Sequence, residues 1–250
     1  MKIIDANAAF GFWPIQRFST RTLEALDAVF ARTDIAEVWL SAVESILYPE
    51  PDEWDLRLFR QLPAFPRFRP VKTVNPLLAN WEKSWDAAKA FPLAAVKLFP
   101  NYHGYSPADR CVDAVCEKAV RENLPVLIQM RVNDERNQPS FLQVVGVSAA
   151  DIAALSRRHP AARIVALCPY NSELSALAEG SNHLLADISF LDGAAILEGA
   201  VQLLSPARLV FGSHEPFLHA DSSRLKLDHS KLPAEVLQKL ASENLAKTNE

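Results

Sequence analysis

Eight short apolar segments alternate with helix-like segments along the 250 residues, and this alternation predicts a single α/β domain, a (β/α)8 TIM barrel spanning residues 1–250. The apolar segments are continuous rather than alternating, which is typical of strands buried on both faces. They lie at about 2–9, 35–42, 67–75, 94–99, 125–132, 163–168, 183–190 and 208–213. A doubly wound open sheet is the competing architecture, but no GxGxxG segment follows the first strand.

Helical patterns fill the intervals between these strands. They span 22–32, 52–61, 79–91, 107–123, 148–159, 172–179 and 194–204, with a last helix at 234–247. Ser106 before Pro107 predicts an N-cap followed by a first-turn proline, and Ser148 three residues before Asp151 predicts a capping pair. Pro233 is expected to open the last helix.

Composition limits the classes of partner. The net charge is −4 with both signs interspersed, so we expect no nucleic-acid binding. No apolar stretch approaches the ~20 residues that span a bilayer, and no signal-peptide pattern follows Met1, so we expect no membrane segment. Three cysteines without a CxxC pattern predict reduced thiols and a cytoplasmic location. The expected partner is a small-molecule substrate, with a homo-oligomer left open.

Side chains at the carboxyl ends of the strands are expected to line the site of such a barrel. The strand-end residues are Asn7, Ala9, Ser41, Asn75, Lys97, Gln129, Arg131, Cys168, Asp187, Ser189, His214 and Glu215. Two long irregular stretches, 133–147 and 215–232, follow the fifth and eighth strands and would shape the site. On the first strand, Asp5, Asn7 and Ala9 are expected on one face because strand side chains alternate with period two.

Lys97 lies in mid-strand between Val96 and Leu98. Because a closed barrel has no edge strand, we expect this lysine to face the barrel interior, where it must be paired, neutralised or used in chemistry. His103, on the loop that follows, is either a substrate contact or an ordinary exposed loop histidine.

Gln129 and Arg131 share a face of the fifth strand. The planar fork of arginine suits a substrate carboxylate or phosphate, and the alternative for Arg131 is an ion pair with a nearby carboxylate, Asp134, Glu135 or Asp5. Asn7 either binds substrate or hydrogen-bonds neighbouring backbone. Cys168 is either a nucleophile or soft ligand, or a small core residue.

Several segments resemble motifs of the amidohydrolase superfamily. Residues 4–11, IDANAAFG, are similar to its first-strand pattern Ile-Asp-x-His-x-His-x-Gly, and residues 96–100, VKLFP, to its Gly-x-Lys-Leu-x-Pro run. Residues 211–217, FGSHEPF, are similar to its Phe-Gly-Ser-Asp-x-Pro-Phe signature, and 244–246 to its closing helix. The resemblance spans nearly the whole chain.

This resemblance implies a TIM barrel and hydrolysis, or sometimes decarboxylation, of a small polar substrate. It also implies a metal site, but the positions of its histidine ligands hold Asn7, Ala9 and Gln129, with Cys168 as a doubtful further position. His214 occupies the place of the catalytic aspartate. We therefore expect no bound metal and no cofactor.

Two functions from different classes follow. The first is a hydrolase of a lactone, amide or ester that works without a metal, in which His214 acts as general base on water while Lys97 and Gln129 stabilise the oxyanion. Its substrate-binding residues would be Arg131, Asn7 and His103. The second is a non-catalytic descendant that binds a small ligand or a protein partner through the same mouth. An open cavity shared by the charged strand-end residues would favour the first.

Overall fold

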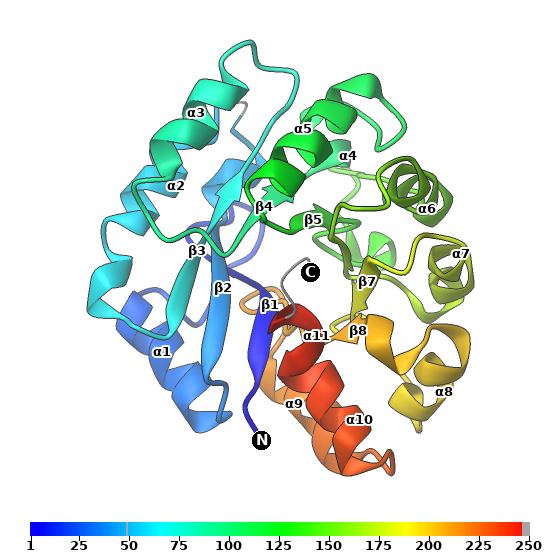
Figure 1. The fold of residues 1–250 in the computed structure, drawn as a ribbon. Coiled ribbons are helices and arrows are strands. Elements are labelled where there is room, and N and C mark those ends of the chain that lie inside the picture. The colour runs from blue at the N-terminus through cyan, green and yellow to red at the C-terminus, as the bar shows by residue number, and fades with distance from the viewer. Residues whose placement is uncertain (49, 247–250) are drawn as a thin grey trace.

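The computed structural model describes residues 1–48 and 50–246, and its eight parallel strands follow one another in chain order around a barrel (Figure 1). The strands are β1 (Ile4–Phe10), β2 (Glu37–Ala42), β3 (Phe68–Thr73), β4 (Ala95–Leu98), β5 (Val126–Gln129), β6 (Ile164–Leu167), β7 (Leu184–Asp187) and β8 (Leu209–Val210). Backbone hydrogen bonds from Ala6 to Phe211 and from Ala9 to Glu215 join β1 to the β8 segment, at 3.0 and 2.8 Å. The predicted (β/α)8 fold is therefore confirmed.

Most helices surround the barrel, whereas the last one, α11, lies across one end of it (Figure 1). They are α1 (Leu23–Arg32), α2 (Asp52–Phe59), α3 (Trp81–Ala88), α4 (Pro100–His103), α5 (Arg110–Arg121), α6 (Ala149–Arg158), α7 (Leu174–Ala178), α8 (Ile196–Leu203), α9 (Ala220–His229), α10 (Ala234–Gln238) and α11 (Asn244–Ala246). A π-helical turn, Lys239–Glu243, joins α10 to α11, and short 3-10 turns lie at Glu44–Ile46, Leu62–Ala64, Glu135–Asn137, Asn171–Glu173 and Pro206–Arg208. Within the described ranges, no helix is both long and apolar enough to cross a membrane.

Helices α1 and α6 begin at residues whose side chains cap them, Thr22 and Ser148. The Ser148 hydroxyl accepts a hydrogen bond from the Asp151 N–H at 3.2 Å, so the predicted cap of α6 is confirmed. The predicted start of α5 at Ser106 is wrong, because Asp109 is the N-cap residue. Ser106 instead accepts from the Ala108 N–H at 3.1 Å and forms a turn before the helix.

Helix α9 corrects the expectation that 215–232 is irregular. Only Ala220, Ser223 and Leu227 of this helix are buried. Its sequence therefore shows little of the apolar periodicity that predicts a helix. The Glu215 carboxylate accepts from the Ala220 N–H at 2.9 Å and satisfies a donor at the first turn. The sequence alone does not reveal this start, because Glu215 lies five residues before Ala220 and outside the usual capping positions.

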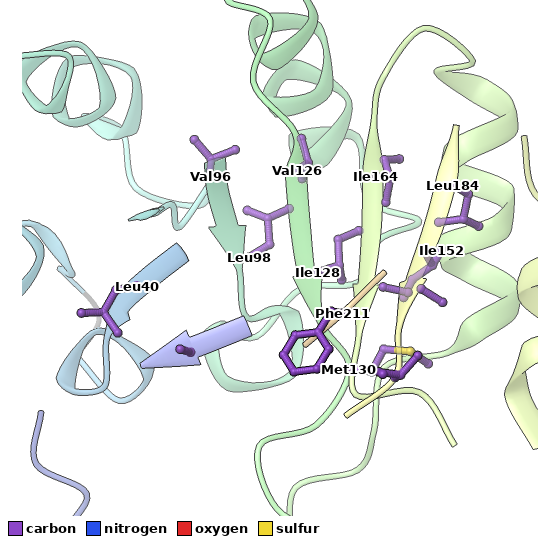
Figure 2. Close-up of a cluster of buried hydrophobic side chains, with 14 of the residues drawn as sticks. Leu40, Val96, Leu98, Val126, Ile128, Met130, Ile152, Ile164, Leu184 and Phe211 are labelled. Atoms are coloured by element: carbon purple, nitrogen blue, oxygen red, sulfur yellow. The ribbon is translucent and has the colours of Figure 1, made fainter. Parts of the chain in front are cut away.

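Two apolar layers separate the outside of the barrel from its inside. Val96 and Leu98 of β4 pack outward with Val126 and Ile128 of β5, in the cluster between strands and helices (Figure 2). Lys97 lies between them and therefore takes the inner face. The inner layer consists of Ile4, Ala6, Trp39, Val71, Ala95, Leu127, Val165, Leu167, Leu185, Val210 and Leu245. This layer fills the barrel below the polar side chains.

Strand β1 departs from strict alternation. Its pairing with β2 shifts register between Asp5 and Ala8. As a result Ala6 belongs to the inner layer, and the neighbouring Asn7 also reaches side chains inside the barrel. The expectation of simple period two over Asp5, Asn7 and Ala9 is wrong at this bulge, which aims Asn7 at the centre.

A glycine after β8 makes room for the end of β7. A Cβ placed on Gly212 would lie 2.5 Å from Asp187 Oδ2 and 2.9 Å from Asp187 Cγ.

We expect Gly212→Ala to destabilise the fold by about 1–3 kcal/mol through overpacking, measured by urea unfolding. Gly199→Ala in α8 is the control, because its Cβ would meet nothing within 4 Å. The control should stabilise by ~0.5–1 kcal/mol, and equal stability of both variants would contradict the account.

Candidate functional site

A buried asparagine connects a lysine and an aspartate inside the carboxyl end of the barrel. Lys97 Nζ donates to Asn7 Oδ1 at 3.0 Å, and Asn7 Nδ2 donates to Asp187 Oδ2 at 2.9 Å. The Ser41 hydroxyl lies 3.5 Å from Lys97 Nζ. The amide of Asn7 thus presents its oxygen to the cation and its nitrogen to the carboxylate, which matches each charge with a complementary dipole.

Cys168 lies beside this chain of contacts. Its Sγ is 3.2 Å from Asn7 Nδ2, 3.0 Å from Gln129 Nε2 and 3.3 Å from Ser189 Oγ. The Ser189 hydroxyl also lies 3.0 Å from each Asp187 oxygen. We call the connected residues the polar cluster: Asn7, Lys97, Gln129, Cys168, Asp187 and Ser189. All come from the carboxyl ends of strands.

Burial sets the protonation of the polar cluster. It lowers the pKa of Lys97 to about 8, partly offset by the nearby carboxyl groups of Asp187 and Asp5. Burial raises the pKa of the Cys168 thiol to about 12, so this cysteine is a neutral thiol near pH 7. Burial also raises the pKa of Asp187, opposed by donors from Asn7, Cys168 and Ser189.

Asp5 links β1 to the segment that follows β8 through hydrogen bonds to both backbones. Its Oδ1 accepts from the backbone N–H groups of Asn7 and Ser213, both at 2.9 Å. Burial raises the pKa of Asp5 to about 7, against these hydrogen bonds. Its Oδ2 is buried without a hydrogen-bond partner among the described residues. Asp5 therefore fixes the backbone that carries Asn7 and His214.

His214 is buried at the same end of the barrel, but it is committed to backbone. Its Nε2–H donates to the Val132 carbonyl at 2.7 Å, and its own N–H donates to the Asn7 carbonyl at 2.7 Å. Burial lowers the pKa of His214 to about 3. The ring is therefore neutral near pH 7 and a weak base. Its φ of 58°, like the 59° of Cys168, is a left-handed conformation that bulky residues rarely adopt.

Arg131 is occupied by protein groups. Its guanidinium donates to both oxygens of Glu173, at 2.8 and 2.6 Å, and to the Cys168 carbonyl. It also stacks 3.8 Å from the centre of the Tyr170 ring. The alternative of a structural ion pair therefore describes Arg131, although the main partner is Glu173 and Glu135 is a second one at 3.5 Å. This geometry does not support its expected role as a substrate ligand.

The two remaining expected site residues, Gln129 and His103, lie in different parts of the structure. Gln129 belongs to the polar cluster; its Nε2 also donates to the Arg131 carbonyl at 2.6 Å, and its Oε1 has no partner in the described part of the chain. His103 ends α4 instead of lying on an exposed loop, and its Nε2 donates to the Ser45 carbonyl at 3.1 Å. None of the contacts of His103 reaches the polar cluster.

An apolar roof separates the polar cluster from solvent. The roof consists of Trp13, Phe99, Val132 and Phe217, which belong to one apolar group. The Phe99 ring centre lies 5.2 Å from Lys97 Nζ, and Trp13 packs edge-on against Phe217 at 5.4 Å. Every residue of the polar cluster is 2% exposed or less. The predicted convergence of polar side chains holds for Lys97 and Gln129, but they do not open into a shared cavity.

A cavity of about 680 Å³ lies over the roof, and we call it the mouth cavity. It is lined by the segments that follow β1, β5, β6, β7 and β8, including Val132, Phe190 and Phe217. His214 contacts all three: it stacks on Phe217 at 4.9 Å, meets Phe190 at 5.7 Å and bonds the Val132 carbonyl. One layer of side chains therefore lies between the mouth cavity and His214.

The donor set does not fit the metal ion that the family resemblance implies. No group of three or more His, Cys, Asp or Glu side chains in residues 1–48 and 50–246 is placed to hold one. Ala9 offers no ligand, and His214 Nε2 is committed to Val132. The Lys97 ammonium hydrogen-bonds Asn7, where the pattern has its first histidine. Asn7 and Gln129 would offer neutral amides, which transition metals bind poorly.

Comparison with known proteins supports the fold. No protein-family model matches the chain, and no curated protein matches it. Among solved structures, it is similar to 5-carboxyvanillate decarboxylase from Sphingomonas paucimobilis, with 14% identity, 98% of both chains covered and a TM-score of 0.71. It is also similar to a dihydroxybenzoic acid decarboxylase from Polaromonas sp. JS666 solved with bound manganese (13% identity, 97% and 95% covered, TM-score 0.72).

A third similar structure is 4-oxalomesaconate hydratase from Rhodopseudomonas palustris, with 14% identity, 97% and 94% covered and a TM-score of 0.68. Other similar structures are described as TIM-barrel and amidohydrolase proteins. These similarities confirm the TIM-barrel fold that the resemblance implies.

Sequence reasoning gave no role to two members of the polar cluster. Asp187 and Ser189 appear among the strand-end residues, and their period-two spacing on β7 is the signal that places both inside. For Cys168 the sequence favoured a small core residue, because a cysteine next to apolar residues carries no mark of its contacts. The partner of Arg131, Glu173, lies 42 positions away and has no local signal.

The buried charge of Lys97 makes stability depend on pH. Because its pKa is about 8 when folded and 10.5 when unfolded, the unfolded chain binds more protons in that interval, and stability should rise with pH between them. Lys97→Met should remove this gain of about 3 kcal/mol, measured by urea unfolding at pH 7 to 10.5. Lys83→Met, at an exposed position on α3, is the control. Parallel pH profiles for wild type and Lys97→Met would contradict a buried ammonium.

Proposed function

We propose that this protein is an amidohydrolase-type enzyme that acts on a small anionic carbonyl or carboxylate compound at the carboxyl end of its barrel. The observation that carries the proposal is the buried Lys97–Asn7–Asp187 chain of contacts beneath the mouth cavity. A buried cation costs folding free energy, so a sequence that keeps one at strand ends favours a use for it. The similar solved structures include decarboxylases and a hydratase, which supports small carboxylates as substrates.

Lys97 is the residue that would hold the substrate's negative charge. In both hydrolysis and decarboxylation, charge builds up on a substrate oxygen, and a fixed ammonium in a water-poor site stabilises it strongly. The ammonium would exchange its bond to Asn7 Oδ1 for one to that oxygen. Asn7, released, keeps its bond to Asp187. Substrate can reach Lys97 only when the roof residues move aside.

Asp187 is the group that would move a proton. Burial raises its pKa toward the working range of a general acid or base, and it lies one amide away from Lys97. This assignment replaces the expected role of His214 as general base, because the pKa of His214 is about 3 and its Nε2–H is committed to Val132. An ascending limb due to His214 would lie near pH 3 instead of in the usual histidine range.

The proposal also states that turnover needs no divalent metal ion. It rests on the poor fit of the donor set and on the position of the Lys97 ammonium beside Asn7. The manganese in one similar decarboxylase makes added Mn²⁺ the sharpest comparison. Gln129 could polarise a carbonyl only through its Nε2–H groups, which already donate to the Arg131 carbonyl and to Cys168 Sγ, whereas its unpartnered Oε1 could accept a hydrogen bond from a substrate.

A second candidate function, binding without catalysis, is favoured by the closed roof. Each member of the polar cluster has a protein partner, and the Arg131 guanidinium forms two hydrogen bonds with Glu173. In this reading the polar cluster only stabilises the barrel, while the mouth cavity holds a small ligand or a protein segment. This function predicts that a ligand binds without turnover and that Lys97→Met leaves its affinity unchanged.

A substrate screen tests the enzyme proposal. Hydroxybenzoates, lactones, esters and amides are incubated with protein stripped of metal by chelator, and with protein given Mn²⁺ or Zn²⁺, while CO₂ release and acid release are both recorded. We expect turnover in the stripped protein, lowered at least about a hundredfold by Lys97→Met and by Asp187→Asn. Lys83→Met should retain wild-type turnover.

Two outcomes count against the proposal. Turnover only with added metal would contradict the metal-free part and leave the enzyme assignment. Activity that Lys97→Met leaves unchanged, in a variant whose thermal midpoint shows it folded, would remove Lys97 from the mechanism.

A further inference from the structure

A second cavity lies beside the barrel mouth, between the segment that follows β1 and helix α2. We call it the side cavity; its volume is about 610 Å³, within the range of small-molecule sites. Its lining includes Arg17 and Arg21 from the first segment and Arg57 from α2. It includes none of the six residues of the polar cluster.

The positive charge of the side cavity is not neutralised by the protein. Arg17, Arg21 and Arg57 form no ion pair with any residue in 1–48 or 50–246. The single carboxylate of the lining, Glu44, accepts the Phe12 N–H at 2.8 Å instead. The lining thus carries three guanidinium groups and one carboxylate, and this net positive charge favours an anionic ligand.

Two buried polar atoms in the lining also lack partners. Trp13 is 1% exposed and Thr20 is 5% exposed, and both line the side cavity. Trp13 Nε1 and Thr20 Oγ1 have no hydrogen-bond partner among the described residues. Buried polar atoms are nearly always satisfied, so two orphans at one cavity indicate a missing hydrogen-bonding group. The indole N–H can only donate, which again fits an acceptor such as a carboxylate oxygen.

The walls of the side cavity are aromatic. Phe10, Phe12, Phe18 and Trp54 join Trp13 in the lining, and the Arg57 guanidinium lies 5.5 Å from the Trp54 ring centre. Flat apolar groups pack well between such rings. We propose that the side cavity is a binding site for a small aromatic carboxylate, with the arginines at the anionic end and the rings around the body. It is separate from the proposed site at Lys97 and does not depend on catalysis there.

Calorimetric titration with 2-naphthoate tests this proposal, with the neutral 2-naphthamide as the matched probe. We expect one 2-naphthoate per chain and little binding of the amide. Arg57→Ala should weaken 2-naphthoate binding roughly tenfold, the usual scale for one charge-assisted hydrogen bond. Arg60→Ala is the matched control, since Arg60 follows the same helix and does not line the side cavity.

Three results would overturn the proposal: no binding of 2-naphthoate at millimolar concentration, equal binding of both probes, or equal weakening by Arg57→Ala and Arg60→Ala. Arg136→Ala separates the two cavities, because Arg136 lines the mouth cavity. Weakening by Arg136→Ala alone would place the probe in the mouth cavity and also overturn the proposal.

Thr20→Val provides an independent measurement. It removes the unpartnered hydroxyl with almost no change in shape, so the thermal midpoint of the free protein should stay the same or rise. The affinity for 2-naphthoate should fall several-fold, because the hydroxyl would bind the ligand. A lower midpoint with unchanged affinity would assign the hydroxyl to the fold and contradict its role in the site.

Discussion

The amide of Asn7 is the contact on which the carboxyl end of this barrel depends. It separates a buried ammonium from a buried carboxylate and hydrogen-bonds both. Without it, Lys97 and Asp187 would each lose a partner in a region that water does not reach, which is strongly unfavourable. The bulge in β1 that turns Asn7 inward, and the Asp5 carboxylate that fixes the following backbone, both support this placement.

The same contact underlies the proposal that turnover needs no metal ion. A cluster of histidines around a divalent cation would carry positive charge at this position, and here the Lys97 ammonium carries it instead. Cys168 stays a neutral thiol because burial and Asp187 raise its pKa. His214 stays neutral because burial lowers its pKa. The Lys97 ammonium therefore carries the positive charge of the site, and the roof of Trp13, Phe99, Val132 and Phe217 keeps it in a low-dielectric environment.

The sequence predicted the barrel well because strand and helix periodicities are local. The strand positions followed from continuous apolar segments, and the inward face of Lys97 followed from its mid-strand place in a closed barrel. What it did not predict depends on contacts between distant segments: α9 starts at a carboxylate upstream, and Arg131 pairs with Glu173. The roof was also beyond reach, because Trp13 and Phe217 are over 200 positions apart and only the fold brings their rings together. The family motifs pointed to His214 as the general base, but the fold brings its Nε2 to the Val132 carbonyl, 82 positions away.

The most direct test of the account is the pKa of Lys97 itself, followed through its ¹³Cε chemical shift as pH is raised, with Lys97→Met to assign the signal. The account predicts a pKa of about 8, since burial lowers it while Asp187 supports the charged form. In Asp187→Asn that support is gone, so the pKa should fall further. An ordinary lysine pKa near 10.5 in the wild type, unchanged by Asp187→Asn, would contradict a buried ammonium held through Asn7.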